Sequence, residues 1–216
     1  MRPRHRRRFA FGRGSSNLRP SQPDRIQALP VQLIRPKRFS DDRGWFSETW
    51  HQARLAEQGI DTRFCQDNHS LSRAAGTLRG LHFQTPPHAQ TKLVRCVAGS
   101  IWDVAVDLRA GSPTYRHWVS ATLSADTGDQ LFIPAGFGHG FVTLEPDSEV
   151  IYKVDDYYAP ECDGGIAWDD PDLALPWPLP DGGPVLSDKD GMLPQLKAWN
   201  SPFAYDGRPL EPLASA

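Results

Sequence analysis

From Ile26 onward the chain is a succession of short apolar runs, each about as long as one β-strand and separated by turn-forming residues. The expected strands are 31–34, 45–50, 64–70, 76–84, 92–98, 101–108, 117–123, 129–133, 139–143 and 150–157. Breaks such as 98–100, 111–113 and 126–128 contain Gly, Ser, Pro or Asp, which favour turns. The 20 prolines and 18 glycines also argue against a helical bundle. Regularly spaced short strands predict an all-β fold, either a double-sheet jelly roll or a barrel.

Only a few short helices are expected. The best candidate is 51–58, closed by Gly59 as a C-cap. Prolines at 171, 176 and 178 exclude a regular central strand there, so the C-terminal third is expected to wrap around the sheets. A short helix is expected after Ser187, whose hydroxyl is suited to an N-cap.

The length of 216 residues predicts one folded domain, which we place at 26–200. Residues 1–25 hold eight arginines and one acid, whereas the remainder carries a net charge of −9. This Arg-, Gly-, Ser- and Pro-rich head is expected to be a disordered tail. It could bind nucleic acid, but a solvated extension is the favoured interpretation. The segment 201–216 is expected to be loose.

The three cysteines are Cys65, Cys96 and Cys162, and they form no C-x-x-C pair. Structural zinc is therefore not expected. The odd number and the lack of a secretory signal indicate reduced thiols in a cytoplasmic protein. No apolar run is long enough to span a bilayer, so no membrane association is expected.

Three ionisable residues close in sequence suggest proton-transfer chemistry. His82 lies in an expected strand, Arg79 precedes it by three residues, and Lys92 follows it by ten. Histidine is the side chain best suited to proton transfer near neutral pH. On an ideal strand Arg79 and His82 would face opposite sides, so a bulge or a strand end at Gly80 is needed to aim both into one cavity. Several acids could orient His82, and spacing does not choose among them.

Two further residues could complete such a site. His139 lies in Pro-x-Gly-x-x-His-Gly-Phe, which resembles the second motif of the cupin superfamily. Metal-binding cupins carry two histidines one residue apart in their first motif, but here that place reads His82-Phe83-Gln84. We therefore expect a pocket without a metal. Tyr152, in an alternating strand, could donate a proton from the face opposite His82.

The order and spacing of the motifs closely resemble the dTDP-4-dehydrorhamnose 3,5-epimerases, a family of metal-free cupins. The resemblance runs from about Ile26 to Leu193. It rests on motifs at 42–48, 66–70, 78–84, 90–95, 103–109, 133–141, 152–153, 157–158 and 186–190. It implies a cupin double-stranded β-helix (jelly roll) with a few short helices. Asp163 stands where a glutamate is common in the family.

The resemblance implies epimerisation at C3 and C5 of dTDP-4-dehydro-6-deoxy-D-glucose to dTDP-4-dehydro-L-rhamnose, without a cofactor, in dTDP-L-rhamnose biosynthesis. It makes His82 the base, Asp190 its orienting carboxylate and Tyr152 the opposing acid. Lys92 would stabilise the enolate oxygen. It assigns substrate contacts to Arg43, Glu48, Gln66, Asp67, Asn68, Arg79, His139, Asp163 and Lys189. It also implies a homodimer, with Arg43 and Glu48 reaching the nucleotide of the partner subunit.

The sequence also fits other functions. Relatives with the same fold epimerise only C3 or only C5 of a dTDP-4-keto-hexose in deoxysugar or antibiotic glycosylation pathways, and small pocket differences decide the outcome. A non-catalytic sugar-binding cupin and a metal-dependent dioxygenase are the alternatives from other classes. The joint presence of His82, Tyr152 and Asp190 favours a catalyst.

Overall fold

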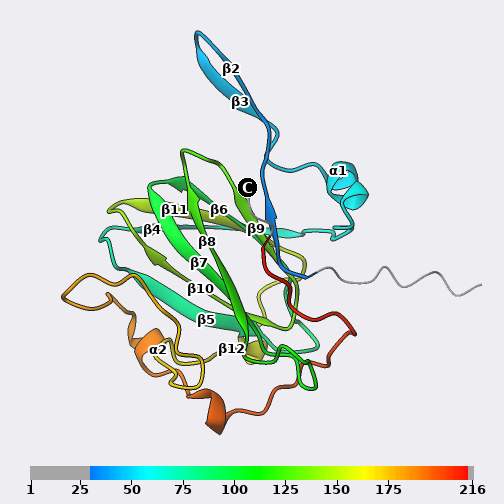
Figure 1. The fold of residues 1–216 in the computed structure, drawn as a ribbon, viewed down its shortest axis with the longest axis vertical. Coiled ribbons are helices and arrows are strands. Elements are labelled where there is room, and N and C mark those ends of the chain that lie inside the picture. Colours follow the sequence, from blue (N-terminus) through cyan, green and yellow to red (C-terminus); the bar gives the residue numbers. More distant parts are fainter. Residues whose placement is uncertain (1–29, 214–216) are drawn as a thin grey trace, which may run out of the picture.

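The computed structural model describes residues 30–213, and the expected basic tail lies outside them. Two five-stranded antiparallel sheets face each other (Figure 1). The first contains, in order, β1 (Gln32–Ile34), β9 (Gln130–Ile133), β6 (Lys92–Ala98), β11 (Ser148–Val154) and β4 (Gln66–Ser72). The second contains β12 (Asp163–Gly165), β5 (Leu78–Gln84), β10 (Phe137–Thr143), β7 (Ser100–Asp107) and β8 (Trp118–Ser124). The predicted double-sheet jelly roll is confirmed.

A two-stranded hairpin, β2 (Arg38–Asp41) and β3 (Gly44–Ser47), projects away from the two sheets (Figure 1). The expected turn at 41–44 is confirmed, but the strand expected at 45–50 is shorter and its partner β2 was not predicted. The short β12 was also missed, because the Asp-Gly-Gly sequence of this strand has no apolar pattern.

The helices are short. They are α1 (Gln52–Glu57), α2 (Asp188–Gly191) and the 3₁₀ turns η1 (Pro160–Cys162) and η2 (Leu196–Ala198). Gly59 follows α1 with a φ of 87°, as a C-terminal glycine requires. Ser187 caps α2 by accepting a hydrogen bond from the Asp190 backbone N–H at 3.1 Å, which confirms its predicted position. Within residues 30–213, no helix has the length and apolar character needed to cross a membrane.

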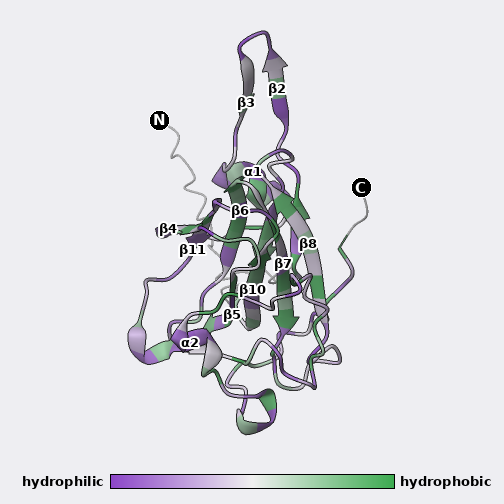
Figure 2. Cartoon of the chain, turned by 90° about the vertical axis from the view of Figure 1, so that its left-hand side faces the viewer, coloured by the Kyte–Doolittle hydropathy of each residue, from purple (hydrophilic) through white to green (hydrophobic). Residues whose placement is uncertain are grey.

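The second sheet is covered by apolar side chains on both faces. Strand β7 shows this directly, because Ile101 and Ala105 join the cluster between the sheets, whereas Val104 and Val106 join a second cluster. The C-terminal third supplies the other side of the second cluster, with Ile166, Leu173, Leu196 and Phe203. Figure 2 shows the hydrophobic colouring concentrated on the strands of the two sheets. Double-sided burial explains why polar alternation is weak in β7 and β10.

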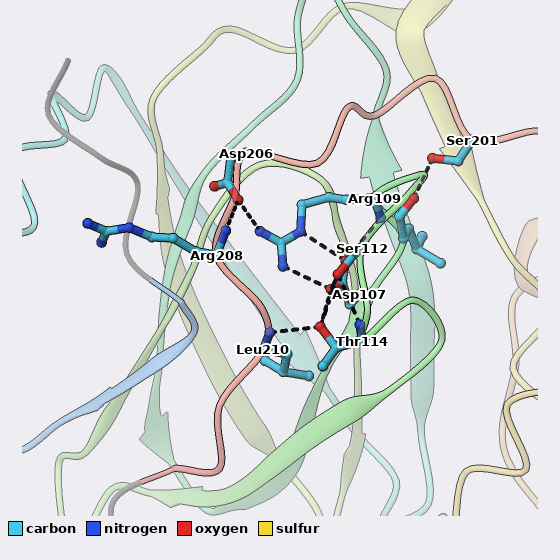
Figure 3. A network of polar contacts seen from close by, with 9 residues as sticks. Asp107, Arg109, Ser112, Thr114, Ser201, Asp206, Arg208 and Leu210 are labelled. Carbon is cyan, nitrogen blue, oxygen red and sulfur yellow. Dashed lines mark hydrogen bonds and ion pairs between the residues drawn. The ribbon is translucent and has the colours of Figure 1, made fainter.

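The end of the described chain is packed, not loose. Phe203 is only 5% exposed, and its ring meets that of Phe83 edge-on at 5.5 Å. Arg109 binds Asp107 and Asp206, each at 2.8 Å, and so ties this segment to the end of β7 (Figure 3). The expectation of a loose C-terminal segment is therefore wrong for residues 201–213. Isolated apolar anchors among prolines have no periodicity that sequence reasoning could detect.

Candidate active site

A cavity of about 260 Å³ collects most of the expected site residues. Its walls come from both sheets, including the edge strand β12 of the second sheet, and from α2. The lining consists of Ser70, Arg79, His82, Phe83, Gln84, Gln90, Lys92, His139, Phe141, Tyr152, Tyr158, Asp163, Lys189 and Asp190. A larger hollow of about 520 Å³ lies between residues 30–33 and 208–213, but its only ionisable side chains are those of Arg208 and Glu211.

A bulge in β5 brings Arg79 and His82 to the same side. His82 pairs with His139 and Arg79 with Phe141, so three steps along β5 oppose two along β10. Gly80 lies in this bulge with a φ of 133°, and a Cβ there would lie 2.5 Å from the Cα of Gly140. Only glycine fits such an approach without displacement of the backbone. The predicted bulge is confirmed.

His82 is held by a carboxylate from a distant part of the chain. Its Nε2 lies 2.5 Å from Asp190 Oδ1, and Asp190 Oδ2 accepts a hydrogen bond from the Ser187 hydroxyl at 2.7 Å. Burial raises the pKa of Asp190, but hydrogen bonds from His82 and Ser187 outweigh it and hold the pKa below its usual value. An ionised Asp190 fixes the proton of His82 on Nε2, which leaves Nδ1 free to accept a proton.

Tyr152 reaches the same cavity from the opposite sheet. It lies on β11, between Asn68 of β4 and Val94 of β6. Burial raises the pKa of Tyr152 above its usual value, so the phenol is protonated at neutral pH. A base on one wall and a proton donor on the other is the arrangement needed to remove a proton from one face of a ring and return one to the other.

Lys92 is a buried cation beside both groups. Only 8% of it is exposed, and its Nζ donates to the His82 carbonyl oxygen at 3.5 Å. Its Nζ also lies 5.9 Å from the centroid of the Tyr152 ring. Burial lowers the pKa of Lys92 to about 8, against the opposing attraction of Asp103 and Asp163. The ammonium is therefore charged at neutral pH and can stabilise a developing enolate.

Four of the expected substrate contacts also line the cavity: Arg79, His139, Asp163 and Lys189. His139 Nε2 lies 2.6 Å from Asp103 Oδ1. Lys189 pairs with Asp163, which also accepts a hydrogen bond from the Tyr158 hydroxyl at 3.3 Å.

Five expected residues lie outside this lining. Gln66 and Asn68 hydrogen-bond each other at 3.0 Å, and Gln66 also accepts from the Tyr158 backbone at 3.2 Å. Asp67 points the opposite way on β4 and pairs with Lys153 at 2.9 Å. The other two are in or next to the projecting hairpin, where Arg43 binds Asp41 at 2.6 Å and Glu48 binds Arg54 at 2.8 Å.

Sequence reasoning missed three residues that shape the site. Asp103 is buried behind His139, and Tyr158 lies at the cavity. The side-chain amide of Gln84 donates to the carbonyl oxygens of His88 and Tyr157 at 2.7 and 3.2 Å. Its oxygen accepts a hydrogen bond from the Ala159 N–H at 2.8 Å. Gln84 therefore fixes the loop 157–159, which contains Tyr158. A polar residue inside an otherwise apolar strand was the available signal for both Asp103 and Gln84.

The two histidines of the cavity each bind one carboxylate. They are cross-strand neighbours, with His82 paired to Asp190 and His139 to Asp103. In the described part of the chain, no three His, Cys, Asp or Glu side chains are grouped as metal ligands. All three cysteines are free thiols.

A jelly roll with an imidazole–carboxylate pair facing a phenol across one cavity defines a cupin-fold protein with an acid–base site. A family model described as dTDP-4-dehydrorhamnose 3,5-epimerase matches residues 27–198, and the chain belongs to this family.

Known proteins with strong similarity include a dTDP-4-dehydrorhamnose 3,5-epimerase from Sinorhizobium fredii. It is 50% identical over 180 residues, which cover 83% of this chain and 92% of the relative. The crystal structure of the Bacillus anthracis epimerase with TDP and PPi bound is 51% identical and has a TM-score of 0.75, covering 77% of this chain and 94% of that one. The Legionella pneumophila epimerase, solved with dTDP-4-keto-L-rhamnose, is 43% identical with a TM-score of 0.76, covering 80% and 92%.

Proposed function

We propose that this protein inverts C3 and C5 of dTDP-4-dehydro-6-deoxy-D-glucose to give dTDP-4-dehydro-L-rhamnose, a step of dTDP-L-rhamnose biosynthesis. The observation that carries the proposal is the placement of His82 and Tyr152 on opposite sheets around one cavity, with Asp190 2.5 Å from His82. The Legionella relative, solved with a keto-sugar nucleotide of this kind, supports the substrate class.

The residues account for each proton. The 4-keto group acidifies the hydrogens on C3 and C5, and His82 Nδ1 takes one of them to leave an enolate. The Lys92 ammonium offsets the charge on the enolate oxygen. Tyr152 then gives its phenolic proton to the opposite face of the same carbon, which inverts it. The imidazolium loses its proton to solvent and the phenolate takes one back, so the cycle can repeat at the second carbon.

The nucleotide would be held by the remaining polar groups. Arg79 and Lys189 are cations at the cavity and suit a diphosphate. His139, Asp163, Gln66 and Asn68 would contact the sugar or the base. Asp67 does not line the cavity, so it would contribute to nucleotide binding only indirectly, as the residue between Gln66 and Asn68 in β4. No cofactor takes part in this scheme, and the cytoplasm is the proposed location.

We also propose that the active unit is a homodimer with shared sites. Arg43 is exposed and Glu48 is half-buried, and neither lines the cavity of its own chain. Arg43 lies in the hairpin that projects from the body and Glu48 directly follows it (Figure 1). This hairpin also exposes three aromatic rings, those of Phe39, Trp45 and Phe46. Exposed apolar rings on an extended arm are typical of an interface. A second copy would cover them and receive Arg43 and Glu48 at its own nucleotide.

Mixing two inactive variants tests the shared site. Arg43→Ala and His82→Asn dimers should each have low activity, but exchange of subunits creates one intact site in each mixed dimer. Random exchange should restore about a quarter of the wild-type activity. No recovery after confirmed subunit exchange, or a monomer in analytical ultracentrifugation, would contradict the shared site.

The reaction itself is tested by NMR of the product formed from dTDP-4-dehydro-6-deoxy-D-glucose. The proposal requires a sugar inverted at both C3 and C5. A product inverted at one carbon would identify a mono-epimerase. Binding of dTDP without any conversion would identify a sugar-binding cupin.

A further inference from the structure

Asp103 is the most unusual buried group of the cavity region. It lies on β7 between Ile101 and Ala105, two residues of the cluster between the sheets, and it is 0% exposed. Its Oδ2 is buried without a hydrogen-bond partner among residues 30–213. Leaving a buried polar atom unpaired destabilises the folded state, and a charged atom does so more strongly. A group this costly needs an explanation beyond packing.

The other oxygen of Asp103 determines what His139 can do. Oδ1 lies 2.6 Å from His139 Nε2, so an ionised Asp103 holds the imidazole proton on that nitrogen. Burial lowers the pKa of His139, although Asp103 opposes this, so the ring is neutral at neutral pH. Its Nδ1 then carries a lone pair and can only accept a hydrogen bond. His139 is thus prepared to bind a hydroxyl of the sugar rather than the enolate oxygen.

Asp103 also acts on Lys92, the cation that faces the enolate. Within the described residues Lys92 forms no ion pair at contact distance. Two carboxylates favour its charged form, and Asp103 has the larger effect on the pKa of Lys92. The second carboxylate, Asp163, is already paired with Lys189. Among residues 30–213 the side chain of Asp103 is hydrogen-bonded only to the neutral His139, so its charge is not taken up by a contact ion pair and can act on Lys92.

The remaining groups around Lys92 do not replace this influence. The charged and titratable side chains lining the same cavity are His82 and Arg79 on β5, His139 on β10, Tyr152 on β11, Asp163 on β12, Tyr158, and Lys189 and Asp190 on α2. Asp190 is engaged by His82 and Ser187. Arg79 and Lys189 are cations, so they cannot stabilise the positive charge of Lys92.

We propose that Asp103 is a positioning residue of the proposed epimerase site: its buried carboxylate fixes the His139 imidazole as a hydrogen-bond acceptor and acts electrostatically on Lys92 in the same cavity. The inference rests on the proposed function, because Lys92 is assigned to the enolate there. It explains why a carboxylate is kept in the apolar interior.

The substitution Asp103→Asn removes the charge with little change of shape. Without this anion the pKa of Lys92 falls below its wild-type value, so the alkaline limb of the kcat/KM profile should move to lower pH. We expect a shift of about one pH unit, equivalent to an additional activity loss of about tenfold above pH 8. Affinity for dTDP, measured by calorimetry, should change less than about threefold because Asp103 is 0% exposed and does not line the cavity.

Two controls separate this effect from a loss of stability. Asp107→Asn makes the same change on the same strand, at a carboxylate that binds Arg109, Ser112 and Thr114 instead of His139. It should lower the free energy of unfolding but leave the alkaline limb in place. Lys92→Arg, whose guanidinium stays charged, should abolish the limb near pH 8. An unchanged limb in folded Asp103→Asn would overturn the proposal.

The wild-type protein provides a measurement that needs no substitution. Nitrogen-15 NMR of the imidazoles should show His139 neutral at pH 7 with its proton on Nε2. A proton on Nδ1, or an imidazolium, would overturn the proposal even if Asp103→Asn failed to fold. Wild-type turnover and dTDP binding are measured first, so failure of the proposed function is recognised separately.

Discussion

At the scale of single residues, chemistry depends on the neighbour of each side chain. The sequence could predict a histidine base, because His82 lies between cations in a strand. It could not select the acid that orients His82 by spacing, since Asp190 is 108 residues away. Only the family resemblance assigned it, and the 2.5 Å contact agrees with that assignment. The polar group missed at this scale, Asp103, interacts with His139 across strands.

Tyr152→Phe tests the proton donor. The ring keeps its packing against the interior, so the free energy of unfolding should change by less than about 1 kcal/mol. Loss of the hydroxyl should lower formation of the doubly inverted product by at least about 100-fold, while His82 still removes substrate protons. Product analysis and proton exchange are followed in the same sample. Wild-type product formation by this variant would show that another group donates the proton.

At the scale of elements, the strand pattern was read correctly for most of both sheets. The expected strand 92–98 coincides with β6, and each of the other nine expected strands overlaps an observed strand. The bulge at Gly80 is present, as predicted. It was predictable because Arg79 and His82, three residues apart, would face opposite sides of a regular strand. The projecting hairpin was half missed: β2 consists of Arg-Phe-Ser-Asp and pairs only with β3, so no buried face gives it a pattern.

Gly80→Ala tests the role of this bulge. The new methyl group would meet backbone atoms of Gly140 and His139 at 2.5 and 2.9 Å, neither of which belongs to a flexible side chain. We expect the free energy of unfolding to fall by about 2–3 kcal/mol and activity to fall with it, because Arg79 and His82 move apart. Urea denaturation gives the stability. Gly182→Ala is the matched control, since nothing lies within 4 Å of its added Cβ; equal effects at both sites would refute this role.

At the scale of the whole molecule, the second sheet is held between two apolar clusters, and one of them is completed by the C-terminal third. The active cavity depends on this arrangement because α2, which carries Asp190, belongs to the same wrap. Sequence reasoning predicted the wrap from prolines and aromatic anchors but ended it at residue 200. The contacts of Phe203 and Asp206 join segments about 100 residues apart, which no local pattern encodes.

Phe203→Ala measures what the last segment contributes. The buried ring contacts Phe83 and Trp199, so its removal should lower the free energy of unfolding by about 3–5 kcal/mol. Met192→Ala, at a side chain that is 77% exposed, should change it by less than about 0.5 kcal/mol. Chemical denaturation of both variants gives the comparison. A loss below about 1 kcal/mol for Phe203→Ala would mean that residues 201–213 are not part of the folded core.

The most direct test of the account is hydrogen exchange between solvent and the substrate sugar. Incubation of dTDP-4-dehydro-6-deoxy-D-glucose with the protein in heavy water, followed by NMR, should show deuterium at both C3 and C5. His82→Asn should show none at either carbon while still binding dTDP. Exchange at near wild-type rate in His82→Asn would contradict the assignment of His82 as the base that faces Tyr152.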